Sequence, residues 1–418
     1  MPRQLPPTAT ATLFVFALCL LHAVTAGAQP QQTPLFDGET LSGFSSTRGG
    51  SLDAWGVIDG EIRIIDAGRG GWLRTNRMYR DFELTFEFRI PEGGNSGVGL
   101  RCASVGDPAF TGFEIQIADS PPGGTDLHHC GAVYNAIPPI GQAFTGPDTW
   151  NTYRIRLVGD SLDVWLNGTR IHNNAALDDR GFFRAPDQRL LLKDRQTTGY
   201  IAFQDHGEGG LRLRNISVTD LSPDPDPGDF EFAFDGRTTN GWTQRGGGVF
   251  RFEDDGDFVA LDGPGHLYSD RVHTDIELHA IVRVATPEET GAPRTGNGGI
   301  YFRTFPNEAN PDTWPTDHGY EAQIDNHDTR STHYTGCVYD KAPAATGKPI
   351  TRDGAWFDYR IRAVGDRIQT FVNGQPMADA QLTEVDRGMI AFQTHHPGNR
   401  IEFRDIRWRV PTADKEPR

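Results

Sequence analysis

The chain alternates apolar and polar residues over many short stretches, which is the period of a β-strand with one buried face. Residues 82–88 and 153–157 are two such stretches, and a further strand expected at 162–166 leads into Asn167-Gly168, a dipeptide that favours a tight hairpin turn. We find no stretch with the 3.6-residue period of a long amphipathic helix. The pattern predicts an all-β protein of antiparallel sandwiches, and its many turns account for the 49 glycines and 28 prolines.

The same order of short motifs occurs twice along the chain. Phe36-Asp37-Gly38 corresponds to Phe234-Asp235-Gly236, and the Gly-aromatic-Glu-x-Gln-Ile motif at 112–117 corresponds to the one at 319–324. The spacing between matching motifs stays between 189 and 207 residues, which is the length of a whole domain. We predict two tandem domains of one fold, at 33–220 and 230–410, joined by a Pro/Asp-rich linker at 221–229.

The first 28 residues have the features of an export signal: a basic start at Arg3, an apolar segment and a small-x-small cleavage site. The apolar segment is too short to cross a membrane, so we expect export to the periplasm or the extracellular space without membrane insertion. The formal net charge of −16 disfavours nucleic acid and anionic membranes as partners. Cys102 and Cys130 either form a disulfide or, like Cys337, are small buried apolar residues.

Strand alternation sorts the repeated motifs into one apolar face and one face that mixes polar side chains with glycine or alanine. Glu114 and Glu321 fall on such a face, and Arg101 is in phase with Gly97 and Gly99. Small residues beside polar ones leave room for a ligand. The candidate site residues are Asn95, Arg101, Glu114, Gln116, Asp119, His129, Gln204, Asp205 and His206 in the first copy, and Tyr301, Arg303, Glu321, Gln323, Asp325 and His395 in the second.

Each of these residues also has a structural interpretation. The outer face of a sheet is commonly polar, and Glu114 and Arg101 could form a cross-strand ion pair. Asp119 and Asp205 could cap turns, and a histidine in a loop is most often a surface residue. The recurrence of Glu and Gln at one spacing in both copies favours a ligand site over these interpretations. Zinc-type spacing such as H-E-x-x-H does not occur, so a divalent metal ion is only an alternative role for the Asp and His residues.

Taken together, the motifs resemble the 3-keto-disaccharide hydrolase domain family. In the first copy they are Leu35-Phe36-Asp37-Gly38, Asp59-Gly60-Glu61, Asp81-Phe82-Glu83-Leu84, Asn95-Ser96-Gly97-Val98, residues 112–117, Trp150-Asn151-Thr152-Tyr153, Gln204-Asp205-His206-Gly207 and Arg214-Asn215-Ile216. The second copy departs from this pattern, with Thr394-His395-His396 in place of residues 205–207. The resemblance implies two tandem concanavalin A-like jelly-roll β-sandwiches with a sugar site on the concave sheet, and cleavage of glycosides already oxidised at C3.

The chemistry of such a substrate suggests roles for the candidate residues. A ketone at C3 acidifies the hydrogen on C2, so a base can remove it, an enolate forms at O3, and the substituent on C1 leaves before water adds back. On this interpretation Glu114 or His206 acts as base or acid, Asp119 is a further candidate acid, and Arg101 stabilises the enolate oxygen. The remaining candidates would hold sugar hydroxyls or, alternatively, a divalent metal ion.

A non-catalytic carbohydrate-binding protein is the alternative function, because a polar concave face suits binding as well as cleavage. Trp72, Tyr301 and Trp314 are the aromatic residues that could stack on sugar rings in that case. Under both hypotheses the partner is an oligosaccharide or a glycoside.

Overall fold

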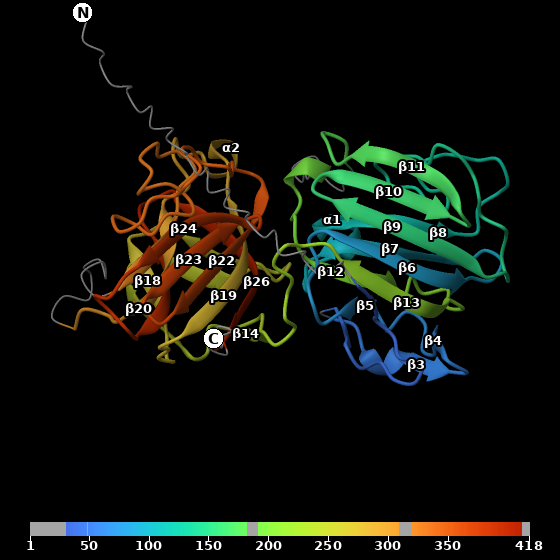
Figure 1. The fold of residues 1–418 in the computed structure, drawn as a ribbon, viewed down its shortest axis with the longest axis horizontal. Helices are drawn as coiled ribbons and strands as arrows, with labels where there is room; N and C mark the ends of the chain where they lie inside the picture. The colour runs from blue at the N-terminus through green and yellow to red at the C-terminus, as the bar shows by residue number, and fades with distance from the viewer. Residues whose placement is uncertain (1–30, 48, 182–190, 309–318, 412–418) are drawn as a thin grey trace, which may run out of the picture.

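The computed structural model describes residues 31–47, 49–181, 191–308 and 319–411, which form two β-sandwiches lying side by side (Figure 1). The prediction of tandem all-β domains of one fold is confirmed. Helical segments in the described residues are short, and none of them is long and apolar enough to cross a membrane. They are α1 (Pro108–Thr111), α2 (Pro287–Thr290) and two 3-10 turns, η1 (Leu52–Ala54) and η2 (Leu192–Asp194). The expected export signal at 1–28 and Trp314 lie outside the described residues, so export stays a prediction.

The first sandwich pairs an eight-stranded sheet with a five-stranded one, and both are antiparallel. The larger sheet has the order β11 (Thr169–Ala176), β10 (Ser161–Leu166), β9 (Asn151–Val158), β6 (Phe82–Arg89), β13 (Arg212–Asp220), β4 (Glu61–Ile64) and β3 (Trp55–Ile58), with β1 (Gln32–Pro34) also paired to β13. The smaller sheet has the order β2 (Phe44–Ser46), β5 (Trp72–Thr75), β12 (Tyr200–Gln204), β7 (Asn95–Cys102) and β8 (Phe113–Ala118).

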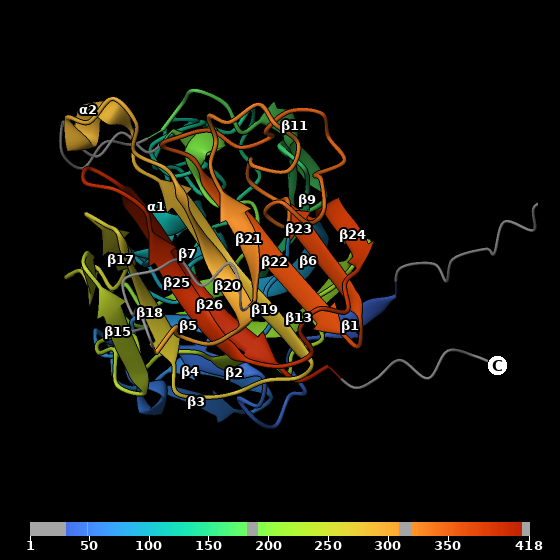
Figure 2. The ribbon, with the colours of Figure 1, turned by 90° about the vertical axis from the view of Figure 1, so that its left-hand side faces the viewer.

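The second sandwich repeats this plan strand for strand. Figure 2 looks onto this domain, where the strands of its larger sheet run side by side. That sheet has the order β16 (Val249–Phe252), β17 (Phe258–Leu261), β26 (Arg400–Arg409), β19 (Ile276–Val284), β22 (Trp356–Val364), β23 (Arg367–Val372) and β24 (Gln375–Gln381), with β14 (Glu231–Phe232) paired to β26. The smaller sheet has the order β15 (Trp242–Gly246), β18 (Gly265–Ser269), β25 (Met389–Thr394), β20 (Gly298–Thr304) and β21 (Tyr320–Ile324).

Each domain has its own apolar core between its two sheets. In β6 the positions alternate between buried and half-buried, as the sequence pattern predicts, and the buried set is Phe82, Leu84, Phe86 and Phe88. Phe86 packs edge-on against Phe203 of the facing sheet, with ring centroids 5.2 Å apart. Burial of such aromatic pairs stabilises the contact between the two layers.

The outer face of the second domain's eight-stranded sheet packs against the first domain. Met78 and Tyr200 of the first domain form a small apolar cluster with Ile281 and Trp356, which point outward from β19 and β22. The linker contributes to the same contact. Asp226 accepts a hydrogen bond from the backbone N–H of Met78 at 2.9 Å and pairs with Arg407 at 3.0 Å, so one carboxylate joins both domains.

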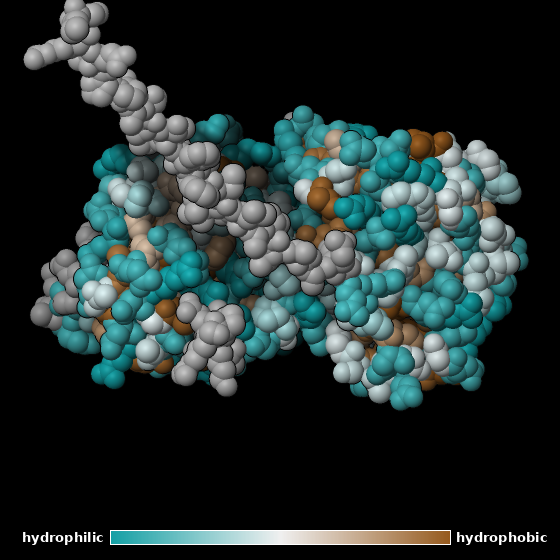
Figure 3. Space-filling model, viewed as in Figure 1, coloured by the Kyte–Doolittle hydropathy of each residue, from teal (hydrophilic) through white to brown (hydrophobic). Residues whose placement is uncertain are grey.

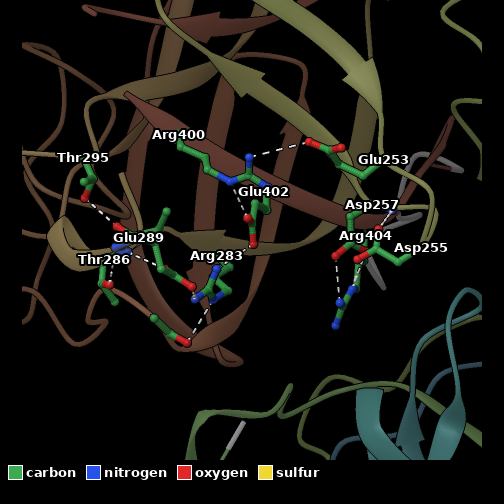
Figure 4. A network of polar contacts seen from close by, with 12 residues as sticks. Glu253, Asp255, Asp257, Arg283, Thr286, Glu289, Thr295, Arg400, Glu402 and Arg404 are labelled. Carbon is green, nitrogen blue, oxygen red and sulfur yellow. Dashed lines mark hydrogen bonds and ion pairs between the residues drawn. The ribbon is translucent and has the colours of Figure 1, made fainter. Parts of the chain in front are cut away.

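Further along this outer face the side chains form a network of ion pairs, drawn in Figure 4. Glu402 lies between Arg283 and Arg400, with both nitrogen–oxygen distances at 2.7 Å. Asp257 receives two bonds from Arg404, at 2.5 and 2.7 Å, and burial raises the pKa of Asp257 to about 6. The surface seen in Figure 3 is mostly hydrophilic, with apolar side chains in scattered small groups.

Candidate functional site

The motif strands β7 and β8 lie together in the five-stranded sheet of the first domain. Gly99 of β7 pairs with Glu114 of β8 on one side and with Ala202 of β12 on the other, and Ala202 pairs with Arg74 of β5. These four residues form one row across the face that points away from the core. The predicted face of Glu114 is therefore the face on which it is found.

Glu114 is buried on this face, with 3% of its surface exposed, and its carboxyl group forms no hydrogen bond with any residue that the structure describes. Burial, followed by the charge of Asp107, raises the pKa of Glu114 to about 8. A Cβ at Gly97 would lie only 1.8 Å from Glu114 Oε1. The room that we expected this glycine to leave for a ligand is thus occupied by the carboxyl group itself.

The second domain has the corresponding row, with a tyrosine at the position of Gly99. Tyr301 pairs with Glu321 on β21 and with Ala391 on β25, and Ala391 pairs with Tyr268 on β18. The Tyr301 hydroxyl donates a hydrogen bond to Glu321 Oε2 at 2.8 Å. Burial raises the pKa of Glu321 to about 8, even though this hydrogen bond acts in the opposite direction. The buried glutamate therefore recurs, but with a donor that the first domain lacks.

Two glutamines flank this pair. Gln393 Nε2 donates to the Tyr301 hydroxyl at 3.0 Å, and Gln323 Nε2 donates to Asn297 Oδ1 at 3.3 Å. The Oε1 atoms of both amides are buried and have no hydrogen-bond partner among the described residues. We did not predict a role for Gln393, although its match to Gln204 in the repeated Ile-Ala-Phe-Gln motif was the signal that could have identified it.

Arg101 and Arg303 are not where the sequence placed them. Both have a left-handed backbone, with φ of 51°, and the ladder between β7 and β12 shifts register beside Arg101. Cys102 consequently takes the position on the glutamate face, where it packs with Ala202. Arg101 Nε and Nη1 donate to backbone carbonyls of the loops that follow β5 and β9, and Arg303 binds three carbonyls in the same way. The expected position of Arg101 on the face of Glu114 is therefore wrong. The cross-strand ion pair with Glu114, considered above as a structural alternative, does not form either, because Arg101 pairs with Asp81 at 3.3 Å.

His206 lies at the rim of the face, beyond the end of β12. Its Nδ1 is 2.6 Å from Glu208 Oε2, and its Nε2 is 3.3 Å from Asn95 Nδ2. The side chain of His206 is 42% exposed. Gln116 lies on the buried part of the same face, and Gln204 is half-buried.

The two aspartates and His129 hold loops instead. Asp205 Oδ2 accepts the backbone N–H groups of Gly68 and Gly70, both at 2.8 Å, and Asp119 accepts that of Gly93 at 2.9 Å. His129 Nδ1 is 2.8 Å from Asp126 within its own loop. The carboxylates of Asp119 and Asp205 therefore bind backbone N–H groups of loops, as the turn-capping interpretation expects.

The rim of the second domain's face carries more charge. Asp325 is buried, pairs with Arg294 and accepts the backbone N–H of His327 at 2.9 Å. His395 is half-buried, and its pKa is lowered by burial and by the neighbouring charges of His396 and Arg294. An open hollow of about 510 Å³ adjoins this rim. Its lining residues are Pro293, Arg294, His327, Asp328, Thr329 and Arg330.

Other candidates pack in the interior. Trp72 is buried against Cys102 and Ala202, so it offers no ring face for a sugar. Cys102, Cys130 and Cys337 are all free and buried, which confirms the small apolar interpretation. Within the described ranges no group of three His, Cys, Asp or Glu side chains could hold a metal ion.

The chain was compared with solved structures and with curated proteins. A candidate glycosyl hydrolase from Parabacteroides distasonis ATCC 8503 is 25% identical, with 46% of this chain and 100% of that one covered and a TM-score of 0.38. A second structure with the same description and organism is 24% identical over 46% and 94%, with a TM-score of 0.37. A carbohydrate-binding module from Bacillus subtilis is 17% identical over 40% and 93%, with a TM-score of 0.31. A search of curated proteins found no match.

The model of the 3-keto-α-glucoside-1,2-lyase-like domain matches the chain twice, at residues 31–219 and 229–409. These two matches cover both sandwiches and both buried glutamates. The chain therefore belongs to the family of 3-keto-α-glucoside-1,2-lyase-like domains, and it contains this domain twice in tandem.

Proposed function

We propose that this chain is a carbohydrate-active enzyme that cleaves 3-keto glycosides by removing the C2 proton and eliminating the substituent on C1. One observation carries the proposal. Glu114 and Glu321 occupy the same register position on the outer face of the five-stranded sheet, each is buried, and each has a pKa raised to about 8.

Such a carboxylate suits the removal of a proton next to a ketone. Its conjugate acid holds a proton about a thousandfold more tightly than an ordinary glutamic acid does, so it is a stronger base. About a tenth of it is ionised at pH 7, which keeps enough of the base form available near neutral pH. A raised pKa at a position shared by both domains is the feature expected of a proton-transfer group.

The other candidates fit supporting roles in this proposal. His206, at the exposed rim, would donate a proton to the leaving oxygen, while Asn95, Gln116 and Gln204 would hold sugar hydroxyls. Since Arg101 is bound to loop carbonyls, the enolate oxygen would be stabilised by amide donors on the face.

The test is a synthetic 3-keto glycoside with a 4-nitrophenolate leaving group, compared with the same glycoside lacking the ketone. We expect cleavage of the first and almost none of the second, because only the ketone makes C2–H acidic. In D₂O, deuterium should enter C2 of the product. The variants Glu114→Gln and Glu321→Gln, with Glu83→Gln on the outer face of β6 as a matched control, identify the base by a loss of ~10²–10⁴ in rate.

Two outcomes would contradict the proposal. Rapid cleavage of the unoxidised glycoside without deuterium at C2 would indicate direct displacement by carboxylates. Sugar binding with no turnover of any keto glycoside would favour the carbohydrate-binding alternative.

A further inference from the structure

The two domains share the buried glutamate but differ in the residue that faces it. In the second domain Tyr301 contacts Glu321, while in the first domain Gly99 holds that register position. A Cβ on Gly99 would lie 2.6 Å from Cys102 Sγ and 3.1 Å from Pro108 Cβ. The first domain therefore has no room for a side chain that would act on Glu114 as Tyr301 acts on Glu321.

The direction of the hydrogen bonds around Tyr301 is determined by their donors. Gln393 Nε2 can only donate, so the Tyr301 oxygen accepts at 3.0 Å, and the hydroxyl hydrogen is left to point at Glu321 Oε2, 2.8 Å away. A hydroxyl donor favours the ionised carboxylate and fixes its orientation. The ionised form of Glu321 is therefore stabilised by a hydrogen bond that Glu114 lacks.

The same face also has acceptors without donors. Oε1 of Gln323 and Oε1 of Gln393 are buried, and no described residue donates to either. Both side chains are at least nine-tenths buried, with 3% and 2% exposed. A buried carbonyl oxygen without a donor is costly, and sugar hydroxyls are donors that a ligand could supply.

We propose that the second domain holds the working proton-transfer site, that Tyr301 is a positioning residue for Glu321, and that Gln323 and Gln393 accept hydrogen bonds from sugar hydroxyls. This rests on the proposed function. The C2 proton passes to Glu321, and the electrons of the C2–H bond form the enolate with its charge on O3. The enolate then returns to the ketone as C1=C2 forms and the C1–O bond breaks, and the departing oxygen takes a proton from water.

Several other titratable groups lie near this carboxyl group. Burial raises the pKa of Glu321, and the charge of Asp340 adds to that effect. Burial also raises the pKa of Cys337, Tyr339 and Tyr359, and the charge of Glu321 adds a smaller contribution in the same direction. The ring of His266 packs edge-on against Tyr301, and burial lowers the pKa of His266 to about 4. His266 is therefore neutral near pH 7 and adds no charge to the site there.

The experiment measures kcat and KM of the full chain against pH, with a 3-keto glycoside whose leaving group is 4-nitrophenolate. Tyr301→Phe should raise the pH midpoint of kcat/KM by about one to two units, because it removes a hydrogen bond to the ionised carboxylate. It should lower kcat about 10–100-fold with little change in KM. Tyr268→Phe, on the same row but outside this hydrogen-bond chain, should leave the midpoint in place.

Glu321→Gln provides a second test if Tyr301→Phe does not fold, since its amide oxygen still accepts from Tyr301. It should cost ~10²–10⁴ in kcat, and more than Glu114→Gln does. An unmoved midpoint in folded Tyr301→Phe, or a greater loss from Glu114→Gln than from Glu321→Gln, would overturn the inference while the proposed function stands. A wild-type chain that cleaves no 3-keto glycoside would instead overturn the proposed function.

Discussion

Replacing Glu114 with Gln should stabilise the first domain at pH 8.5 and change its stability little at pH 4.5. Glu114 is 3% exposed, and burial raises the pKa of its carboxyl group from the ordinary 4.5 to about 8. Between pH 4.5 and pH 8 the carboxyl group of Glu114 keeps its proton in the folded chain and releases it in the unfolded chain. The stabilisation is therefore complete below pH 4.5 and is lost as the pH rises through 8. At about 1.4 kcal/mol per pH unit, the loss amounts to about 3–5 kcal/mol.

Urea unfolding of the wild type and the variant, followed by fluorescence at four pH values from 4.5 to 8.5, measures this difference. Gln is neutral at every pH, so the free energy of unfolding of the variant should not show the decrease that the wild type shows between pH 4.5 and 8. Glu61→Gln is the control with the opposite sign. Burial raises the pKa of Glu61, but Arg212 and Arg63 together lower it below its ordinary value. Its stabilisation is present above about pH 4.5 and is lost at lower pH. A difference between Glu114→Gln and wild type that does not vary from pH 5 to 8.5 would refute the burial argument.

Three further substitutions test other parts of the structure. Arg101→Met should lower the melting temperature of the first domain by about 6–15 °C, because the loss of this buried cation costs about 3–5 kcal/mol. Calorimetry measures the melting temperature, and a lost kcat with unchanged melting would restore the catalytic role of Arg101. Gly299→Ala places a Cβ 2.4 Å from Glu321 Oε1, so kcat should fall about 10–100-fold in a protein whose circular dichroism is unchanged, and an unaltered kcat would argue against Glu321. Asp226→Ala should cost about 3 kcal/mol and broaden or split the calorimetric transition, because Arg407 loses its buried partner; an unaltered transition would show that the joint does not depend on this carboxylate.

The fold and the glutamate faces could be predicted because they depend on regular alternation. β6 and β8 keep their period without interruption, so Glu114 emerges on the expected side. The internal repeat then extends the same conclusion to Glu321. Local pattern and tertiary packing agree at these positions, and structure can be predicted from sequence where the two agree.

The arginines could not be placed because one residue breaks the alternation. Arg101 has a positive φ, which few residues other than glycine adopt, so nothing in its identity signals the shift. The role of Gly97 could not be predicted either, because the space beside it is filled by the side chain of Glu114 from the neighbouring strand. The pairing of Tyr301 with Glu321 depends on the register between β20 and β21, which the sequence does not encode locally.

The segment between the domains has a consequence for producing them separately. Asp224 pairs with Arg360, and Asp226 pairs with Arg407, whose side chain is 2% exposed. A C-terminal half that begins at residue 230 would lack both carboxylates. Arg407 would then lose its buried partner beside Ile281 and Trp356, while Arg360 would keep its ion pair with Glu277. A half that begins at residue 221 would keep both carboxylates. The Pro/Asp segment therefore belongs with the second domain when the two are expressed apart, and we expect the half that keeps this segment to be the more soluble one.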